Sequence, residues 1–419
     1  MAQTSLEGFA TKTSAGASAG VQQKTQRIPF AGMMSLFFLC GFLTALNDIW
    51  VPYLKDAFDL SHTAASLVPT SFFFAYFIVS PIAGKMIDRV GYQNGIVFGL
   101  LTTALGCLLF FPAVAQHIYG LYLFAFFVVA SGIAILQVAA NPYVTALGPQ
   151  KTSPSRLNLA QSTNSLGTTI GPWIGTLFIL DTVISKATEI NISIVTLYAV
   201  LACTLVCTAI IFAKLIKLPR IVAVEANQDN NQIVWSNRPL ILGALAIFLY
   251  VGAEVSIGTW LVVYFKNSVV VGLDGISAGR MITFYWLGAL IGRLIGALLM
   301  KYIAAPRYLS INALMAITTI MISINSSGNV AMVSILAVGF FNSIMFPTIF
   351  ALALKGLGPM TNRGSGLLCQ AIVGGAFIPV IQGAAADSLG IQLSFIVPML
   401  CYIYIGWYAL RGANKNQKF

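Results

Sequence analysis

The stretch FAGMMSLFFLCGFLTALNDIWVPY, residues 30–53, indicates what kind of protein this chain is. It has the length of a helix that crosses a bilayer, which needs about 20 apolar residues. It also contains one acidic residue, Asp48. A carboxylate in hydrocarbon costs at least ~2.5–3.5 kcal/mol on insertion scales. We therefore expect Asp48 to pair with a partner, to take up a proton, or to hold an ion.

The rest of the chain has the same character. Hydrophobic residues make up 58% of it, charged residues only 8%, and the mean hydropathy is +0.86. Water-soluble domains average about 25% charged residues, so the composition indicates an all-α polytopic membrane protein. A membrane barrel would show short alternating segments instead. The long apolar stretches predict twelve spans, at 30–54, 63–84, 94–115, 119–145, 157–181, 192–214, 239–264, 276–300, 307–326, 329–354, 365–386 and 391–410.

The longest polar interruption divides these spans into six plus six. The first residues are rich in Ser, Thr, Ala, Gly and Gln and lack an apolar core, which predicts a disordered tail and no signal peptide. The predicted units are a cytoplasmic tail at 1–29, a six-helix bundle at 30–214, a central cytoplasmic loop at 215–238, a second six-helix bundle at 239–411, and a cytoplasmic tail at 412–419.

The basic residues predict the orientation. With the N-terminus inside the cell, only Lys55, Lys186, Lys266 and Arg280 face out, while the other loop Lys and Arg face the cytoplasm. Basic loops beside anionic headgroups account for the net charge of +11 without a nucleic-acid partner. We expect a multi-pass protein of a bacterial inner (plasma) membrane, with both termini cytoplasmic.

Polar side chains inside the spans are scarce, so each one is informative. Those that stand out by their spacing or charge are Thr44, Asn47 and Asp48 in the first span, Gln137 and Asn141 in the fourth, Asn158, Gln161, Asn164 (or Ser165) and Thr168 in the fifth, and Glu254 in the seventh. Several are spaced by three or four residues and so share one helix face. Each also has a simpler explanation, which is a hydrogen bond that only holds two helices together.

The chemistry of these groups favours a neutral polyhydroxy substrate. Amides offer paired donors and acceptors that suit sugar hydroxyls. The aromatic faces of Trp260, Tyr285 and Trp286 suit stacking on a sugar ring, or they serve as packing and interfacial anchors. A cationic drug would favour more carboxylates, and an organic anion would favour an embedded basic residue, for which Arg293 is the only midspan candidate.

The loop after the second span reads GKMIDRVGYQNG, residues 84–95. Its Gly84, Asp88, Arg89 and Gly91 resemble the G-x3-D-R-x-G loop of the major facilitator superfamily, although Tyr92 and Gln93 replace the usual basic pair. A partial echo, IGRLIGALLMKYIAAPR at 291–307, retains Arg293 and its flanking glycines. The resemblance implies two six-helix bundles around a central substrate cavity. We expect Gly84, Asp88, Arg89 and Arg293 to act in conformational gating; a solvated charged turn is the alternative for the loop.

Longer strings resemble the fucose permease and glucose/galactose permease family. They include LNDIWVPYLK (46–55), LQVAANPYVTALGP (136–149), RLNLAQSTNSLGTTIGP (156–172) and FLYVGAEVSIG (248–258). The resemblance implies a sugar:cation symporter in which Asp48 matches the coupling aspartate, while Gln161 and Asn164 match the substrate-contacting pair. Gln137 occupies the position of a key glutamate in the fucose branch, so a two-acid scheme cannot operate unchanged. The glucose/galactose branch is more similar, which favours glucose or galactose, with N-acetylglucosamine as a further candidate.

These expectations combine into one mechanism. Asp48 binds a proton or a sodium ion, with Thr44 and Asn47 as further sodium ligands. Sugar then binds to amides, and the halves rock to release both inside. The predicted substrate contacts are Asn47, Gln137, Asn141, Gln161, Asn164, Glu254, Trp260, Tyr285 and Trp286. Glu254 is either a sugar ligand or a gate.

No cofactor, metal cluster or enzymatic constellation is predicted, and we expect a monomer in the bilayer. Two other classes stay open. One is an efflux antiporter for drugs or sugars, and the other is a sensor that keeps a transporter fold without transport.

Overall fold

The computed structural model describes residues 27–61, 64, 67–175, 187–216, 218 and 236–412. Most of the predicted N-terminal tail, the central loop and the last residues lie outside this part of the chain. The described part is helical throughout, with no strand assigned in it. The first half contains α1 Arg27–Ala57, α3 Leu67–Gln116, α4 Tyr119–Ala146, the short 3-10 turn η1 Gln150–Thr152, α5 Ser153–Gly175 and α6 Ala187–Lys214.

The second half is broken into more pieces. It contains α7 Arg238–Lys266, α8 Gly275–Leu299, α9 Ala305–Ile324, α10 Gly328–Asn342, α11 Met345–Leu354, η5 Gly358–Met360, α12 Thr361–Gln370, η6 Ala371–Val373, α13 Gly374–Leu389, α14 Ile391–Ser394, α15 Ile396–Trp407 and η7 Tyr408–Gly412. Here α10 with α11, α12 with α13, and α14 with α15 each follow one predicted span. At one of these breaks the helices α7 and α13 pack closely, because a β-carbon at Gly374 would lie 2.0 Å from the carbonyl oxygen of Phe248.

The predicted spans are recovered, with one difference in the first half. The second and third spans run together as α3, whose 50 residues would extend about 75 Å, more than twice the hydrocarbon thickness. The chain changes direction at Gly91, where φ is +80° and ψ is 169°, a conformation that favours glycine. The predicted loop is therefore a single glycine break between two helices.

Length and composition identify ten membrane-spanning candidates among the described residues. One of them is the doubled α3, and α5 is absent from the ten because polar residues occupy it. Counting α3 twice and adding α5 gives the predicted twelve crossings. The architecture is thus an all-α membrane fold, with two bundles of six crossings.

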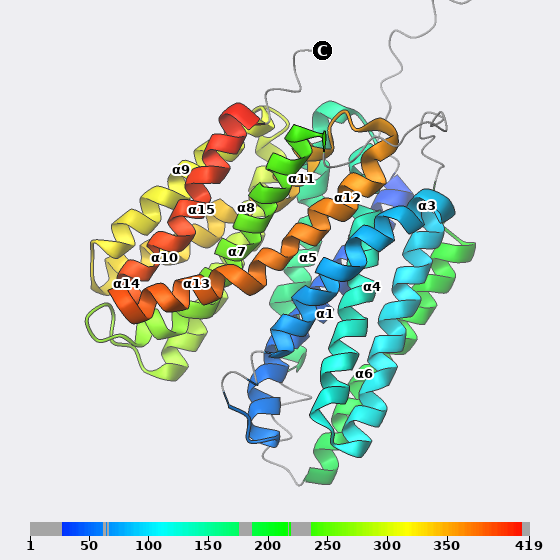
Figure 1. The fold of residues 1–419 in the computed structure, drawn as a ribbon, viewed down its shortest axis with the longest axis horizontal. Coiled ribbons are helices and arrows are strands. Elements are labelled where there is room, and N and C mark those ends of the chain that lie inside the picture. The colour runs from blue at the N-terminus through cyan, green and yellow to red at the C-terminus, as the bar shows by residue number, and fades with distance from the viewer. Residues whose placement is uncertain are drawn as a thin grey trace, which may run out of the picture.

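The two halves lie side by side (Figure 1). Within the first half, α3 packs on α4 and α6, and α1 packs on α5. Within the second half, α7 packs on α13, α11 and α15, while α10 packs on α8 and α9. The halves meet where α12 contacts α3 and α4, and where α5 contacts α8 and α11.

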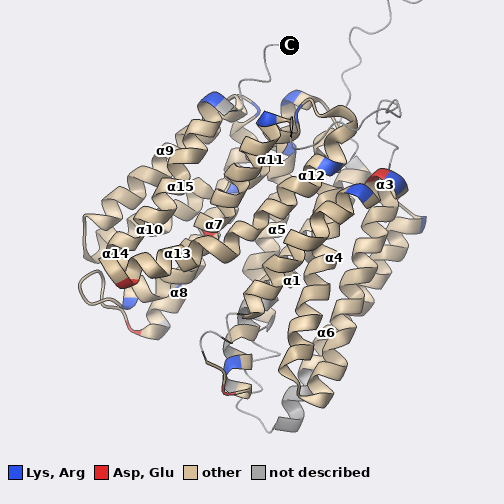
Figure 2. Cartoon of the chain, viewed as in Figure 1, with Lys and Arg blue, Asp and Glu red and all other residues tan. Residues whose placement is uncertain are grey.

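Charge is distributed unevenly along the helices. Most of the Lys and Arg positions coloured in Figure 2 gather at the upper end of the molecule. We call this the basic end, and it holds Lys151, Lys301, Lys355 and Arg363. The contact between α12 and α3 lies at this end.

Candidate functional site

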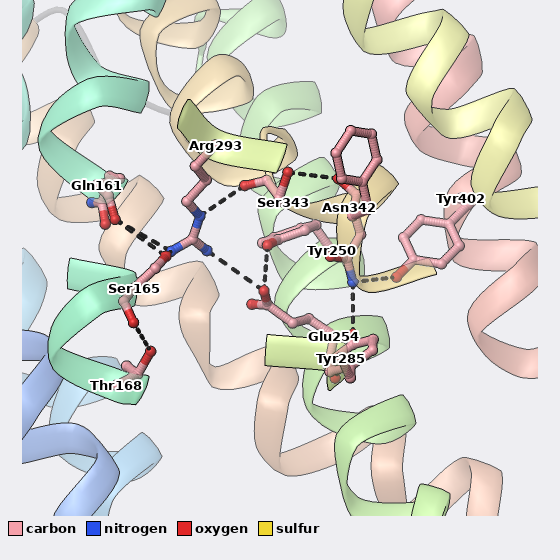
Figure 3. A network of polar contacts seen from close by, with 11 residues as sticks. Gln161, Ser165, Thr168, Tyr250, Glu254, Tyr285, Arg293, Asn342, Ser343 and Tyr402 are labelled. Carbon is pink, nitrogen blue, oxygen red and sulfur yellow. Dashed lines mark hydrogen bonds and ion pairs between the residues drawn. The ribbon is translucent and has the colours of Figure 1, made fainter. Parts of the chain in front are cut away.

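Arg293 of α8 lies at the centre of a polar network that joins the two halves (Figure 3). Its side chain is 10% exposed. Nε donates to the carbonyl of Ser343 at 2.9 Å, and Nη2 lies 3.6 Å from Oε1 of Glu254. Nη1 donates to the hydroxyl of Ser165 and, at 3.4 Å, to the carbonyl of Gln161. One guanidinium therefore contacts α7 and the end of α10 in its own half, and α5 in the other half.

Glycines bring α8 close enough to α10 for these contacts. A β-carbon at Gly292 would lie 2.3 Å from the carbonyl oxygen of Phe340, and one at Gly288 would lie 3.2 Å from the Phe340 nitrogen. The glycines of the sequence echo around Arg293 thus have a packing reason. Small residues at such crossings let two backbones approach each other closely.

Glu254 of α7 is surrounded by neutralising partners. The hydroxyl of Tyr250, one turn earlier, donates to its Oε1 at 2.7 Å, and Arg293 lies beside the same oxygen. The hydroxyl of Tyr285 donates to the backbone carbonyl of Glu254 at 3.4 Å. A buried carboxylate needs such a pair, because an isolated charge in a low-dielectric interior costs several kcal/mol. From the sequence we expected Glu254 to be a sugar ligand or a gate. In the structure it lies in the Arg293 network.

Asn342 extends the network within the second half, and sequence reasoning missed it. Its Nδ2 donates to the hydroxyls of Tyr285 at 2.7 Å and Tyr402 at 3.1 Å (Figure 3). The residue is fully buried, and in the part of the chain that the structure describes its Oδ1 has no hydrogen-bond partner. An Asn within an otherwise apolar predicted span was the signal that could have identified it.

The first half contributes amides. Nε2 of Gln161 donates to Oδ1 of Asn141 at 3.1 Å, which joins α5 to α4. Nε2 of Gln137 donates to the hydroxyl of Tyr76 at 3.1 Å. Asn141 is fully buried, and its Nδ2 has no hydrogen-bond partner among the described residues. Three of the predicted substrate amides therefore lie on α4 and α5, and the Arg293 network reaches Asn141 through Gln161.

Asn164 is placed elsewhere. Its Nδ2 donates to the carbonyl of Phe37 on α1 at 3.1 Å. A β-carbon at Gly41 of α1 would lie 2.1 Å from the carbonyl oxygen of Asn164, so the two helices touch at this point. In this conformation the predicted substrate residue Asn164 holds α5 against α1, and it is not bonded to the Asn141 and Gln161 amides.

The predicted coupling residues lie on α1. The backbone at Asn47 and Asp48 is helical, but both side chains lie outside the described part of the structure. One turn earlier, Thr44 donates its hydroxyl proton to the carbonyl of Cys40 at 2.8 Å. The coupling role of Asp48 and the sodium-ligand roles of Thr44 and Asn47 stay predictions.

The predicted aromatic contacts fall in the second half. Tyr285 is fully buried, and its ring stands edge-on to Trp286 with centroids 5.2 Å apart. Nε1 of Trp260 donates to the carbonyl of Pro379 at 3.1 Å, which joins α7 to α13. Tyr285 thus belongs to the Asn342 network, while the two tryptophans are partly exposed.

The predicted gating loop contacts the opposite half at the basic end. Nε of Arg363 lies 3.0 Å from Oδ2 of Asp88, and Nδ2 of Asn362 donates to Oδ1 of Asp88 at 2.9 Å. A β-carbon at Gly84 would lie 2.8 Å from the carbonyl oxygen of Asn362, so α3 and α12 approach closely. Arg89 is exposed beside this contact.

Further hydrogen bonds cross between the halves from the middle of the spans toward the basic end. They are Ser155 Oγ to the Ala297 carbonyl at 2.5 Å, Asn158 Nδ2 to Thr348 Oγ1 at 3.1 Å, and Ser365 Oγ to the Val138 carbonyl at 2.8 Å. Asn158, predicted as part of a polar stripe, belongs to this set. Polar contacts therefore hold the halves together from the Arg293 network to the basic end.

Known proteins are similar to this chain in sequence and in fold. The model of the Major Facilitator Superfamily matches residues 33–369. The "Glucose/galactose transporter" of Brucella abortus is 48% identical over 94% of this chain and 96% of its own length. The "Putative glucose/galactose transporter" of Helicobacter pylori (strain ATCC 700392 / 26695) is 42% identical over 95% of this chain and 100% of its own.

A solved structure agrees with these relatives. A crystal structure of the transporter FucP in the outward conformation superposes with a TM-score of 0.84 at 32% identity. The match covers 93% of this chain and 99% of that one. FucP is the fucose:proton symporter of Escherichia coli.

Proposed function

The chain belongs to the Major Facilitator Superfamily, and from this we propose that it is a secondary transporter that imports a neutral hexose, glucose or galactose, with a cation. The observation that carries the proposal is the amide cluster of Gln161 and Asn141, in a chain so similar to proteins named glucose/galactose transporters. The unpaired Nδ2 of Asn141 is a buried donor available to a sugar hydroxyl. Gln137 adds a second amide from the same helix.

The basic end is the cytoplasmic end in this proposal, because Lys and Arg are enriched in cytoplasmic loops. Both termini then lie in the cytoplasm of a bacterial cell, and the protein acts as a monomer in its inner membrane. The hydrogen bonds of Ser155 and Asn158 and the ion pair of Asp88 join the halves between the Arg293 network and this end. The molecule is then closed toward the cytoplasm, as in an outward-facing transporter.

Asp48 is the coupling acid. Of the 12 Asp and Glu residues in the chain, only Asp48 and Glu254 fall well inside predicted spans. Glu254 is already compensated by Arg293 and Tyr250, so neutralising it would leave the guanidinium without its counter-charge. Asp48 is the better carrier of a cation that binds and leaves in each cycle.

The transport cycle follows from these roles. A proton or sodium ion from outside neutralises Asp48, which lowers the cost of enclosing the site. The hexose binds to the amides of α4 and α5, with Trp260 and Trp286 beside it. The halves then rock so that the contacts at the basic end separate, and both cargoes leave inside. The charged, empty carrier reorients slowly, so the two fluxes are coupled.

The test is counterflow of labelled hexoses in proteoliposomes, with sodium and pH varied independently. We expect exchange of glucose or galactose, and accumulation against a gradient only when a cation gradient is present. Dependence on sodium at fixed pH, or on pH in sodium-free buffer, identifies the cation. Failure of every hexose to exchange would contradict the proposal and favour a sensor.

The coupling role is tested with Asp48→Asn. This variant should lose cation-driven accumulation while it retains counterflow, because exchange needs no net return of the empty carrier. The matched control is Asp59→Asn, which also replaces a carboxylate by an amide. Asp59 is exposed and follows α1, and its φ of +47° is a conformation that Asn tolerates. Normal accumulation by Asp48→Asn would show that the coupling acid is another residue.

A further inference from the structure

A large cavity lies between the two halves at the basic end, away from the Arg293 network. Its volume is about 1130 Å³. The first half lines it with residues 87–92 and 142–154, and the second half with residues 300–306 and 351–362. Loops of both halves therefore form its walls, and anything bound there would contact both halves at once.

The walls of this cavity are basic. Lys151, Lys301 and Lys355 line it, and each comes from a different loop. Asp88 is the one carboxylate in the described lining, and its two oxygens are already bound by Arg363 and Asn362. The three lysines thus surround a space in which the one carboxylate of the described lining is already bound.

A buried arginine adds to this charge from behind the wall. Arg156 is only 6% exposed. Its guanidinium donates to the Thr152 hydroxyl at 2.6 Å and to the carbonyls of Val144, Thr145, Gly148 and Pro149, at 2.6–3.3 Å. All of these partners are neutral, and Thr145, Gly148 and Thr152 line the cavity. Within the described residues Arg156 forms no ion pair. A buried guanidinium without a carboxylate favours an anion nearby.

The N-termini of three helices add to the positive charge around the cavity. α5 begins at Ser153, α9 at Ala305 and α12 at Thr361, and all three residues line the cavity. The N-terminus of a helix carries partial positive charge and unsatisfied N–H groups. The preference for basic cytoplasmic loops accounts for lysines at this end, but it accounts for neither the burial of Arg156 nor the placement of three lysines around one cavity.

We propose that this cavity binds a small organic phosphate. The lysines and Arg156 provide the positive field for a phosphate group, and Gln150, Thr152 and Thr361 provide neutral hydrogen-bonding groups for the rest of the molecule. Because the walls come from both halves, a bound anion holds the basic end closed. If the transport cycle proposed above holds, the anion favours the outward-facing state and slows transport; binding itself does not depend on that cycle.

The binding test uses the full chain, purified in detergent, at constant ionic strength. Inorganic phosphate and glycerol 3-phosphate are titrated by calorimetry, with glycerol as the neutral match; none of these probes is a hexose. The test variant is Lys151→Gln/Lys301→Gln/Lys355→Gln, and Lys301→Gln alone serves if the triple variant folds poorly, since Lys301 is exposed. The matched control is Lys214→Gln, an exposed lysine in the last turn of α6, outside the cavity lining.

We expect glycerol 3-phosphate to bind and glycerol not to bind. The triple variant should bind about tenfold more weakly or worse, because each lost charge removes part of the attraction, and Lys214→Gln should bind normally. A parallel arm in nanodiscs compares the binding of phosphatidylglycerol with that of phosphatidylcholine. If only phosphatidylglycerol binds, and its binding depends on the three lysines, the phosphate site is supported and is assigned to a lipid headgroup.

Two results would overturn the proposal: no binding of any phosphate, or an equal loss of binding in Lys214→Gln and the triple variant. In proteoliposomes, phosphate on the side of the basic end should also slow hexose counterflow by the wild type and leave the triple variant unaffected. Binding without an effect on counterflow would refute the link to closure and leave the hexose proposal intact.

Discussion

The two halves of the central region differ in the chemistry that they offer. The first half presents amides that are bonded to neutral partners, Gln161 to Asn141 and Gln137 to Tyr76. The second half presents an ion pair, Arg293 with Glu254, among buried tyrosines. Amides can exchange a protein partner for a sugar hydroxyl at small net cost, whereas an embedded ion pair cannot lose one member cheaply. If the chain transports a hexose as proposed, we expect the first half mainly to recognise the substrate and the second half mainly to maintain the contact between halves.

Removal of Arg293 should give the largest effect. In Arg293→Gln, Glu254 loses its counter-charge and the α5 carbonyl of Gln161 loses a donor, so we expect a loss of about 3–5 kcal/mol in the free energy of unfolding. Denaturant titration in detergent measures it. Arg293→Gln/Glu254→Gln should recover much of that stability, because no isolated charge then stays buried. If Arg293→Gln is as stable as the wild type, the ion pair with Glu254 contributes little to the free energy of unfolding.

Close helix crossings occur in both halves, so they test whether the halves are equally rigid. A β-carbon would lie 2.1 Å from the backbone at Gly41 and 2.0 Å at Gly374, but would meet nothing within 4 Å at Gly120. We expect Gly41→Ala and Gly374→Ala each to cost about 1–3 kcal/mol of stability, and Gly120→Ala to be near neutral or stabilising. Thermal unfolding measures all three. A normal melting temperature for Gly41→Ala alone would mean that α1 yields more easily than α13.

Asn141 and Asn342, one in each half, are two of the buried amides with one polar atom unpaired in the described part of the chain, and they give the sharpest test of the division of roles. Asn141→Leu, in the first half, should raise the KM for hexose by about tenfold or more, since a hydrogen bond to the substrate is worth about 1–3 kcal/mol when its partner is left buried. Asn342→Leu, in the second half, should lower the melting temperature while KM stays within about twofold of wild type, because its amide bonds only Tyr285 and Tyr402. Counterflow kinetics and thermal unfolding separate the two. A larger change of KM in Asn342→Leu would reverse the assignment.

Loss of the exposed pair at the basic end should give the smallest effect on stability. Arg363→Gln removes an ion pair whose side chains are 46% and 23% exposed, so we expect about 0.2–1 kcal/mol. The functional consequence is a shift toward the state that is open at the basic end. It can be measured as faster alkylation of a cysteine introduced at Ser365, which contacts Val138 across the halves. Arg411→Gln, at the same end but outside this contact, is the control.

The sequence was sufficient to predict the fold. Long apolar runs, the polar break after the sixth span, and the G-x3-D-R-x-G loop each reflect local physics that needs no tertiary knowledge. Within the site, the amides of α4 and α5 could be selected because polar groups in hydrocarbon are rare. The contact of Asp88 with Arg363 could not be predicted, since its residues lie far apart in the chain and neither helix alone determines the pairing.

Other parts of the site depend on tertiary packing. Asn164 belongs to the same polar stripe as Gln161, but Gly41 lets α1 approach and gives Asn164 a backbone acceptor there. Asn342 was missed because one amide in an apolar run has no periodic partner. The sequence identified Arg293 as a midspan basic residue with a role in gating, but it cannot reveal that its side chain reaches α5 in the opposite half.

One detail of that contact bears on how such proteins diversify. Arg293 meets position 161 through the main-chain oxygen, whereas the side chain of Gln161 is directed to Asn141. Any residue type offers the same oxygen to the guanidinium. If Gln161 contacts the sugar as proposed, a mutation at this position can change the preferred sugar and keep the hydrogen bond between the two halves. The same contact between halves can then be kept in carriers of different carbohydrates.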